Sequence, residues 1–119
     1  MEQLIAIYKM LSDETRLRII VLLAQKELCV CELSEILAVS QPKISKNLGK
    51  LRDLNLVKPK RKEKFVFYKL KTDNPILNRT VKSILDNLDD YPQLVIDKSR
   101  HIDNKKNLDL CCNYHTIQL

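Results

Sequence analysis

Two pairs of cysteines are the residues of this 119-residue chain that could do the most specific chemistry. Cys29 and Cys31 are separated by one residue, and Cys111 and Cys112 are adjacent. A disulfide inside either pair would be strained, because the chain between the two sulfur atoms is too short. Thiolates bind soft ions such as As(III), Sb(III), Cd(II), Pb(II) and Zn(II). The pairs therefore indicate metal binding, redox sensing or the packing of small apolar side chains.

A cluster of basic residues is the second feature. Residues 41–71 contain 11 Lys and Arg and two acids, a net charge of +9, whereas the rest of the chain sums to −3. Such a local excess predicts a surface for a polyanion, although a solvated basic face that binds nothing has the same composition. Four polar residues of this segment recur at helical spacing, opposite an apolar stripe: Lys43, Lys46, Asn47 and Lys50.

The elements that position these residues follow from the apolar spacing, which predicts a mainly α-helical chain of about five or six helices. The expected inner faces of the first four are Leu4, Tyr8 and Leu11; Leu17, Ile20, Val21 and Ala24; Leu33, Ile36 and Leu37; and Ile44, Leu48 and Leu51. We expect Ser12 and Ser40 to cap the second and fourth helices. Residues 38–40 then form a tight connection between the third and the fourth.

Residues 56–70 predict a two-stranded β-hairpin. Aromatic and β-branched residues flank a charged tip at residues 60–64, and Pro59 restricts the first strand to an edge. Asn74 and Pro75 begin a fifth helix, which residues 89–92 end. From Gln93 onward the pattern is weak, and we expect a partly helical C-terminal extension.

Two short helices joined by about three residues, the second with a basic stripe, form a helix-turn-helix pattern. The basic hairpin that follows is a wing. The major groove of DNA admits one helix, whose first turns meet the base edges while basic side chains reach phosphates. The predicted DNA-binding residues are Ser40, Gln41, Pro42, Lys43, Ser45, Lys46, Asn47 and Lys50 on the helix, with Lys60, Arg61, Lys62 and Lys64 on the wing.

Three runs of sequence resemble the ArsR/SmtB family of winged-helix repressors. They are LSDETRL at residues 11–17, ELCVCEL at residues 27–33 and SQPKISKNL at residues 40–48. The second is close to the metal-binding signature of the arsenic-responsive members. The resemblance implies a winged helix-turn-helix repressor that binds operator DNA as a homodimer. It also implies that the repressor leaves the DNA when it binds a metal or metalloid ion.

The predicted inducer is As(III) or Sb(III), bound by thiolates. Cd(II), Pb(II) or Zn(II) at the same site, or oxidation of the thiols, are the alternatives. We expect a DNA-binding and dimerisation domain at residues 1–90 and a C-terminal extension at residues 91–119. The first and fifth helices are expected to form the dimer contact, because both are apolar beyond what one core needs.

Cys29 and Cys31 are the first predicted metal ligands. Side chains at i and i+2 diverge on an α-helix, so both can hold one ion only where the start of the third helix is not helical. Trivalent arsenic takes three thiolates, and Cys111 or Cys112 of the same or the partner chain is the expected third ligand. Alternatively, His115 completes a zinc-like site with Cys112.

Four positions bear on departures from the pattern that the resemblance implies. Ser34 stands where some arsenic-responsive members have a third cysteine. Asn47 stands where family members often have a histidine, directly after the Ile-Ser-basic run of the recognition helix. Asp97 and His101 only hint at the second metal site that zinc-responsive members carry on the last helix of the dimer.

Several other classes of protein are disfavoured. Two histidines and the lack of a Gly-rich phosphate loop argue against an enzyme. No apolar run approaches the ~20 residues of a membrane span. The N-terminus shows no secretory signal. The expected protein is therefore a cytoplasmic regulator that is neither an enzyme nor a membrane protein.

Overall fold

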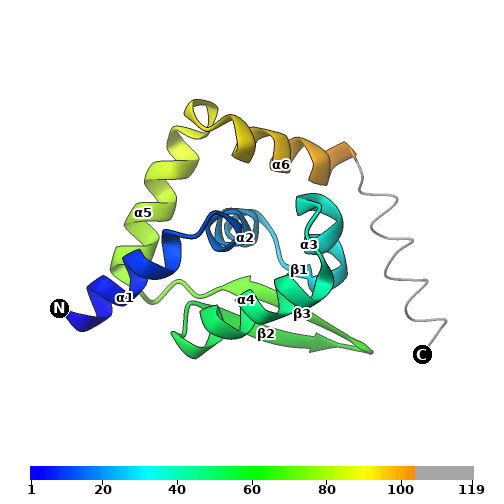
Figure 1. Cartoon of the computed structure of the whole chain (residues 1–119), viewed down its shortest axis with the longest axis horizontal. Coiled ribbons are helices and arrows are strands. Elements are labelled where there is room, and N and C mark those ends of the chain that lie inside the picture. Colours follow the sequence, from blue (N-terminus) through cyan, green and yellow to red (C-terminus); the bar gives the residue numbers. More distant parts are fainter. Residues whose placement is uncertain (104–119) are drawn as a thin grey trace.

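The structure is a computed structural model that describes residues 1–103. Cys111, Cys112 and His115 lie outside the described residues, as do the predictions made on them. The described helices are α1 (Glu2–Leu11), α2 (Glu14–Gln25), α3 (Val30–Leu37), α4 (Gln41–Asp53), α5 (Pro75–Asp86), the 3-10 turn η1 (Leu88–Asp90) and α6 (Pro92–Asp103). The strands are β1 (Leu28–Cys29), β2 (Val57–Lys62) and β3 (Phe65–Leu70) (Figure 1). The mainly helical winged fold is confirmed.

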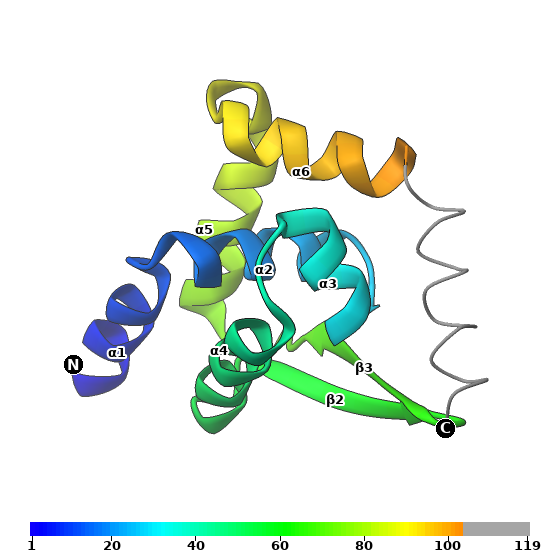
Figure 2. The same cartoon turned by 45° about the vertical axis from the view of Figure 1, so that its right-hand side comes forward.

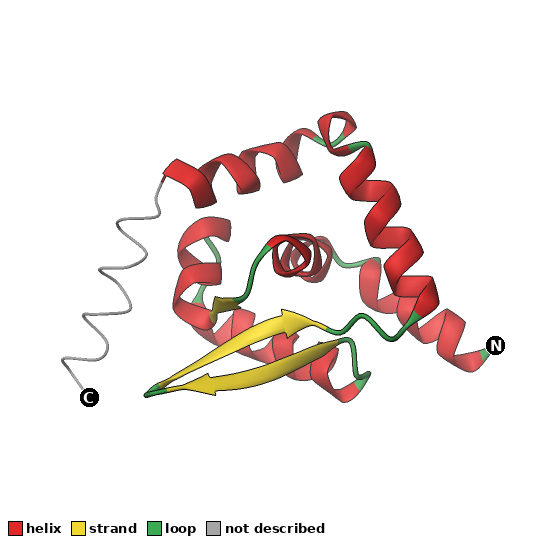
Figure 3. Cartoon of the chain, turned by 180° about the vertical axis from the view of Figure 1, so that it is seen from behind, coloured by secondary structure: helices red, strands yellow, loops and turns green. Residues whose placement is uncertain are grey.

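Helix α2 is the centre of the core. Figures 1 and 3 show it end-on, surrounded by α5, α6, α3 and the sheet. Its residues from Ile19 to Leu23 are all buried, as expected for a helix that is apolar over much of its circumference. The apolar faces of α3 and α4 pack beside it and include Leu33, Ile44 and Leu48, each 0% exposed. This packing fixes α3 and α4 relative to each other.

Two details of the N-terminal helices differ from the sequence prediction. The cap of α2 is Asp13, whose carboxylate accepts the Arg16 N–H at 3.0 Å, whereas the Ser12 hydroxyl donates to the Lys9 carbonyl at the end of α1. A carboxylate at the N-terminus also interacts favourably with the helix dipole. The inner face of α1 carries Ile7 and Leu11, and Tyr8 is 54% exposed.

The sheet contains a strand that the sequence did not reveal. Its order is β1-β3-β2, with both pairs antiparallel, and Cys29 of β1 lies opposite Phe67 of β3. Pro59 lies in the edge strand β2, as predicted. The charged tip is shorter than predicted, because Lys62 pairs with Phe65 and leaves a two-residue turn. Glu63 makes that turn in the left-handed region, with φ of 56°.

The C-terminal part is more regular than its weak pattern suggested. Asn74 caps α5 as predicted, and its side chain accepts two backbone N–H groups at 3.1 Å. Helix α6 turns back and packs against α2 and α3 (Figures 1 and 2). Within residues 1–103 no helix has the length and apolar character needed to cross a bilayer.

Candidate DNA-binding surface and thiol site

Helix α4 presents a polar face. Ser40 is its N-cap and Pro42 lies in its first turn, while Ala38 closes α3 in the left-handed conformation with φ of 56°. Seven of the eight predicted DNA-binding residues around this helix are exposed, namely Ser40, Gln41, Pro42, Lys43, Ser45, Lys46 and Lys50. With the hairpin, this helix lies on the side of the molecule opposite α6 (Figures 1 and 3). The basic face of α4 is therefore open to a partner.

Asn47 is the exception, and its predicted place on the exposed face is wrong. The side chain is only 6% exposed. Its amide donates to the Lys43 carbonyl at 3.0 Å, and its oxygen accepts from the Arg16 guanidinium at 3.5 Å. Asn47 lies at the boundary between two faces of α4, the buried face that carries Ile44 and Leu48 and the face that carries the basic stripe. It thus joins α4 to the start of α2 instead of facing outward.

The wing carries the second group of basic residues. Lys60, Arg61, Lys62 and Lys64 are all exposed. Lys62 is held in place, because its ammonium lies 3.2 Å from the Glu27 carboxylate and 5.4 Å from the centre of the Phe67 ring. The hydrogen bond from Lys62 lowers the pKa of Glu27. Glu27 is a wing contact that sequence reasoning missed.

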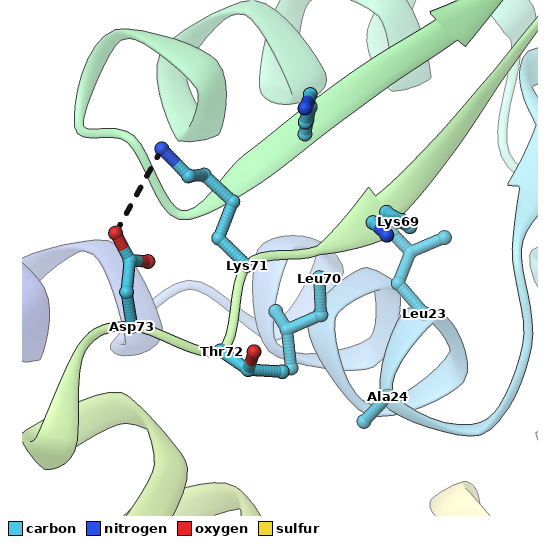
Figure 4. Close-up of a pocket in the computed structure, with 8 residues that line it drawn as sticks. Leu23, Ala24, Lys69, Leu70, Lys71, Thr72 and Asp73 are labelled. Carbon is cyan, nitrogen blue, oxygen red and sulfur yellow. Dashed lines mark ion pairs between the residues drawn. The ribbon is translucent and has the colours of Figure 1, made fainter.

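The basic surface also extends to the base of the hairpin. A hollow of about 350 Å³ lies there, between Leu23 and Ala24 of α2 and the segment from Lys69 to Asp73 (Figure 4). Lys58 lines it too, and Lys58 and Lys69 are direct cross-strand neighbours. The Lys71 ammonium has an acidic partner, Asp73, at 4.0 Å. Like charges directly opposite each other on neighbouring strands repel, and the charge of Lys69 also contributes to lowering the pKa of Glu27.

The predicted thiol pair lies at the junction of β1 and α3. Cys29 is extended, with φ of −94° and ψ of 171°, and α3 begins at Val30. The pair therefore straddles the strand end and the first turn of the helix, so the two side chains are not fixed on opposite sides of one helix. Both residues are buried, at 3% and 8% exposure. The Cys29 N–H donates to the Glu32 carboxylate at 3.1 Å, which ties the junction together.

One cavity of about 360 Å³ joins these cysteines to the DNA-binding elements. It is lined by Cys29, Val30, Cys31, Gln41, Lys64, Phe65, Val66 and Tyr68. The cysteines come from the β1–α3 junction, Gln41 from the start of α4, and the others except Val30 from the wing turn and β3. Phe65, Val66 and Tyr68 of β3 supply a largely apolar wall. The sequence did not reveal this cavity.

The other positions considered for metal binding have structural contacts. The Ser34 hydroxyl donates to the Val39 carbonyl and so holds the turn between α3 and α4. Asp97 is 1% exposed and accepts two hydrogen bonds from the Arg18 guanidinium, at 2.8 and 2.9 Å. That hydrogen bonding raises the pKa of Arg18. Within residues 1–103 no three His, Cys, Asp or Glu side chains gather into a metal site.

Comparisons with known proteins agree with this geometry. The model of the family described as "Bacterial regulatory protein, arsR family" matches residues 13–58. The chain is 44% identical over 70 residues to the arsenic resistance transcriptional regulator ArsR1 of Pseudomonas putida, covering 58% of this chain and 55% of that one. It is 46% identical over 72 residues to the arsenical resistance operon repressor of Escherichia coli, covering 60% and 62%.

A cadmium resistance regulatory protein, CadC of Listeria innocua, also matches, with 38% identity over 65 residues that cover 54% of this chain and 55% of that protein. The aligned part of the chain thus spans about three-fifths or less of the length of these curated relatives. Among solved structures, HlyU from Vibrio cholerae is similar, with 31% identity and a TM-score of 0.65, covering 73% of this chain and 91% of HlyU.

The matched region spans the start of α2 to the first residues of β2, and so includes Cys29, Cys31, α3 and α4. The relatives named above are transcriptional regulators or regulatory proteins, and none is named as an enzyme. The order of the elements, the HlyU-like fold and the family match agree. Residues 13–58 of the chain form a helix-turn-helix domain of the arsR family of bacterial regulatory proteins.

Proposed function

We propose that this protein is a transcriptional repressor that binds operator DNA as a homodimer and leaves it when Cys29 and Cys31 bind As(III) or Sb(III) as thiolates. The observation that carries the proposal is the position of the thiol pair. Both cysteines lie directly before or within the first turn of α3, and both line one cavity. A ligand there acts on the first helix of the helix-turn-helix pair.

DNA binding is supported by the exposed face of α4 and by the wing. An α-helix fits the major groove, and Gln41 and Ser45 are exposed residues whose side chains can hydrogen-bond to base edges. Lys43, Lys46 and Lys50 are exposed on the same helix and suit phosphates. We assign the wing residues to the adjoining backbone or minor groove.

The dimer is supported by apolar side chains that one subunit leaves exposed. Ile5 and Tyr8 on α1 are 48% and 54% exposed, and α1 and α5 lie at the same end of the molecule (Figures 1 and 3). We assign DNA binding and dimerisation to residues 1–90, followed by a C-terminal extension at residues 91–119 that carries Cys111 and Cys112. A two-fold dimer presents two copies of α4, so the operator is an inverted repeat. Its half-site centres lie about 34 Å, or a small multiple of that, apart.

Release of DNA follows from coupling between the two sites. Ligation draws the β1–α3 junction out of its present geometry, which shifts α3 and re-aims α4. The ion needs only to bind the DNA-free conformation better, by a coupling of about 1–3 kcal/mol. A third thiolate comes from Cys111 or Cys112. The thiols stay reduced in the cytoplasm, where we place the protein.

Two alternatives use the same cysteines. A sensor of Cd(II), Pb(II) or Zn(II) is favoured by the similarity to a cadmium resistance regulator. A redox switch is the other, because thiolates also react with oxidants. Titration of the DNA-bound protein with arsenite, cadmium and peroxide, followed by fluorescence anisotropy, distinguishes the three. Dissociation by arsenite at the lowest concentration supports the proposal, and dissociation by peroxide alone contradicts it.

A further inference from the structure

The carbonyl end of α3 is closed by two arginine side chains from outside the helix-turn-helix. The last four carbonyl groups of an α-helix have no partner inside the helix. In α3, the backbone of the following turn satisfies one of them. The Glu35 carbonyl accepts from the Arg100 guanidinium at 2.8 Å. The Leu37 carbonyl accepts from the Arg18 guanidinium at 3.4 Å. Cations at this end of a helix also interact favourably with its dipole.

Both of these contacts depend on α6. Arg100 belongs to α6 itself. Arg18 belongs to α2, and its guanidinium is oriented by Asp97 of α6, which accepts from it at 2.8 and 2.9 Å. One nitrogen of Arg18, Nη2, donates both to Asp97 and to the Leu37 carbonyl. Because two parallel hydrogen bonds fix the plane of a guanidinium, α6 sets the position at which Arg18 meets the end of α3.

The end of α3 in turn sets the position of α4, because the connection between the two helices is short. Only residues 38–40 separate them. The hydrogen bond from the Ser34 hydroxyl to the Val39 carbonyl ties this turn to α3. Ala38 takes the left-handed conformation, which leaves a non-glycine residue little freedom. A displacement of the end of α3 therefore passes to the first turn of α4, from which a recognition helix reads base edges.

We infer that Arg100 and Arg18 are positioning residues for sequence-specific DNA binding, and that α6 is part of the unit that reads DNA. Neither arginine needs to contact DNA, because α6 lies on the side of the molecule opposite α4 and the hairpin (Figures 1 and 3). The inference rests on the DNA binding of the proposed function and is independent of any ion at the cysteines. It extends the DNA-reading unit beyond the residues 1–90 assigned above.

Positioning predicts a particular kind of defect. Contacts to base edges require an accurately placed helix, whereas attraction to phosphates supplies most of the binding to unrelated sequences. Loss of the arginine contacts should therefore weaken binding to the preferred sequence and spare binding to other DNA. A residue that acts only through its charge would weaken both alike.

The test uses the full chain and two DNA duplexes. One duplex is selected by the unmodified protein from a pool of random sequences, and the other contains the same bases in shuffled order. Fluorescence anisotropy gives the specificity ratio, which is the dissociation constant for the shuffled duplex divided by that for the selected duplex. Urea denaturation measures the stability of each variant, so that binding is compared at equal concentrations of folded protein.

Four variants separate positioning from charge. Arg100→Ala removes the contact to the Glu35 carbonyl, whereas Arg100→Lys keeps the charge and a donor. Asp97→Asn leaves a single acceptor oxygen for the Arg18 guanidinium and so removes the two-point contact that orients it. Lys98→Ala is the matched control, because it removes one exposed charge from the same helix.

We expect Arg100→Ala and Asp97→Asn each to reduce the specificity ratio about fivefold, which is the lower end of the usual coupling between linked sites. Binding to the shuffled duplex should be nearly unchanged. Arg100→Lys should restore most of the ratio, and Lys98→Ala should leave it unchanged. An unchanged ratio in Arg100→Ala or in Asp97→Asn, or an equal loss in Lys98→Ala, would overturn the inference. Failure of the unmodified protein to select any sequence from the pool would instead overturn the proposed function.

Discussion

Arg18 on α2 and Asp97 on α6 form a bidentate ion pair, although they are 79 residues apart in the sequence. Its two hydrogen bonds have N–O distances of 2.8 and 2.9 Å. Asp97 is 1% exposed and also accepts from the Gln93 amide at 3.1 Å. The Arg18 guanidinium donates in addition to the Leu37 carbonyl at the end of α3, at 3.4 Å. The pair therefore holds α6 against both the core helix and the first helix of the helix-turn-helix.

Replacing Asp97 by Ala should lower the free energy of unfolding by about 3 kcal/mol, because it leaves the largely buried Arg18 cation without its partner. Urea denaturation measures this change. Asp86→Ala is the matched control, since Asp86 pairs with Lys82 at 4.0 Å on the surface. Exposed pairs on one helix contribute about 0.3–0.5 kcal/mol. Equal effects of the two substitutions would show that Asp97 does not hold α6 in place.

Asp97 also illustrates what the sequence could not reveal. Its spacing to His101 suggested a metal site, since residues at i and i+4 share one face of a helix. The actual partner of the carboxylate lies on α2, and no local pattern encodes a pairing over 79 positions. The weak apolar pattern after Gln93 did not predict the full length of α6 for the same reason. Helix α6 is held in part by Leu94 and Asp97, one apolar and one charged residue, rather than by an apolar stripe.

Asn47→Ala should destabilise the protein by about 1 kcal/mol without changing which bases are preferred. The amide is buried and hydrogen-bonded, so its removal deprives the Lys43 carbonyl of one donor and the Arg16 guanidinium of one of its two acceptors, the other being the Met10 carbonyl. Thermal unfolding and competition with altered operators measure the two effects. Ser45→Ala, on the exposed face, should instead relax the base preference and leave the stability of the protein nearly unchanged. A relaxed base preference in Asn47→Ala would show that Asn47 contacts DNA despite its burial.

DNA affinity should depend strongly on salt concentration, because the positive excess of residues 41–71 lies on α4 and the wing. Lys46→Ala should reduce the slope of log affinity against log salt by about 1, as expected when one phosphate contact is lost. Lys98→Ala, an exposed lysine on α6, should leave the slope unchanged. The measurement is anisotropy at several salt concentrations. Equal slopes for Lys46→Ala and the unmodified protein would show that Lys46 of α4 makes no phosphate contact.

The Glu27–Lys62 pair should give stability a small acid dependence. The folded state lowers the pKa of Glu27 below 4.5, mainly through the hydrogen bond from Lys62. A lowered carboxylate pKa contributes stability above the unfolded value, and this contribution is lost as pH falls through the folded value. The melting temperatures of the protein and of Glu27→Gln should therefore differ by a constant amount above pH ~5 and converge as the pH falls through the lowered pKa of Glu27. A difference that grows on acidification would contradict the pairing.

Local pattern was sufficient to predict much of the candidate site. The basic face of α4, the hairpin and the cysteine pair are all encoded within short segments of sequence. The cavity is not, because its far wall is formed by β3, which pairs with the two-residue strand β1 from a distant part of the chain. Two residues are too short a strand to be recognised by alternation. Asn47 was misplaced because it lies between the apolar and the basic face of one helix.

The central claim is that Cys29 and Cys31 are the sensor, and one measurement tests it most directly. Operator binding by a Cys29→Ser, Cys31→Ser double variant is followed by fluorescence anisotropy with and without arsenite. The Cys111→Ser, Cys112→Ser variant serves as the comparison. We predict that the first variant binds the operator with nearly unchanged affinity and no longer dissociates when arsenite is added. Normal dissociation of that variant by arsenite would contradict the account and place the sensor elsewhere in the chain.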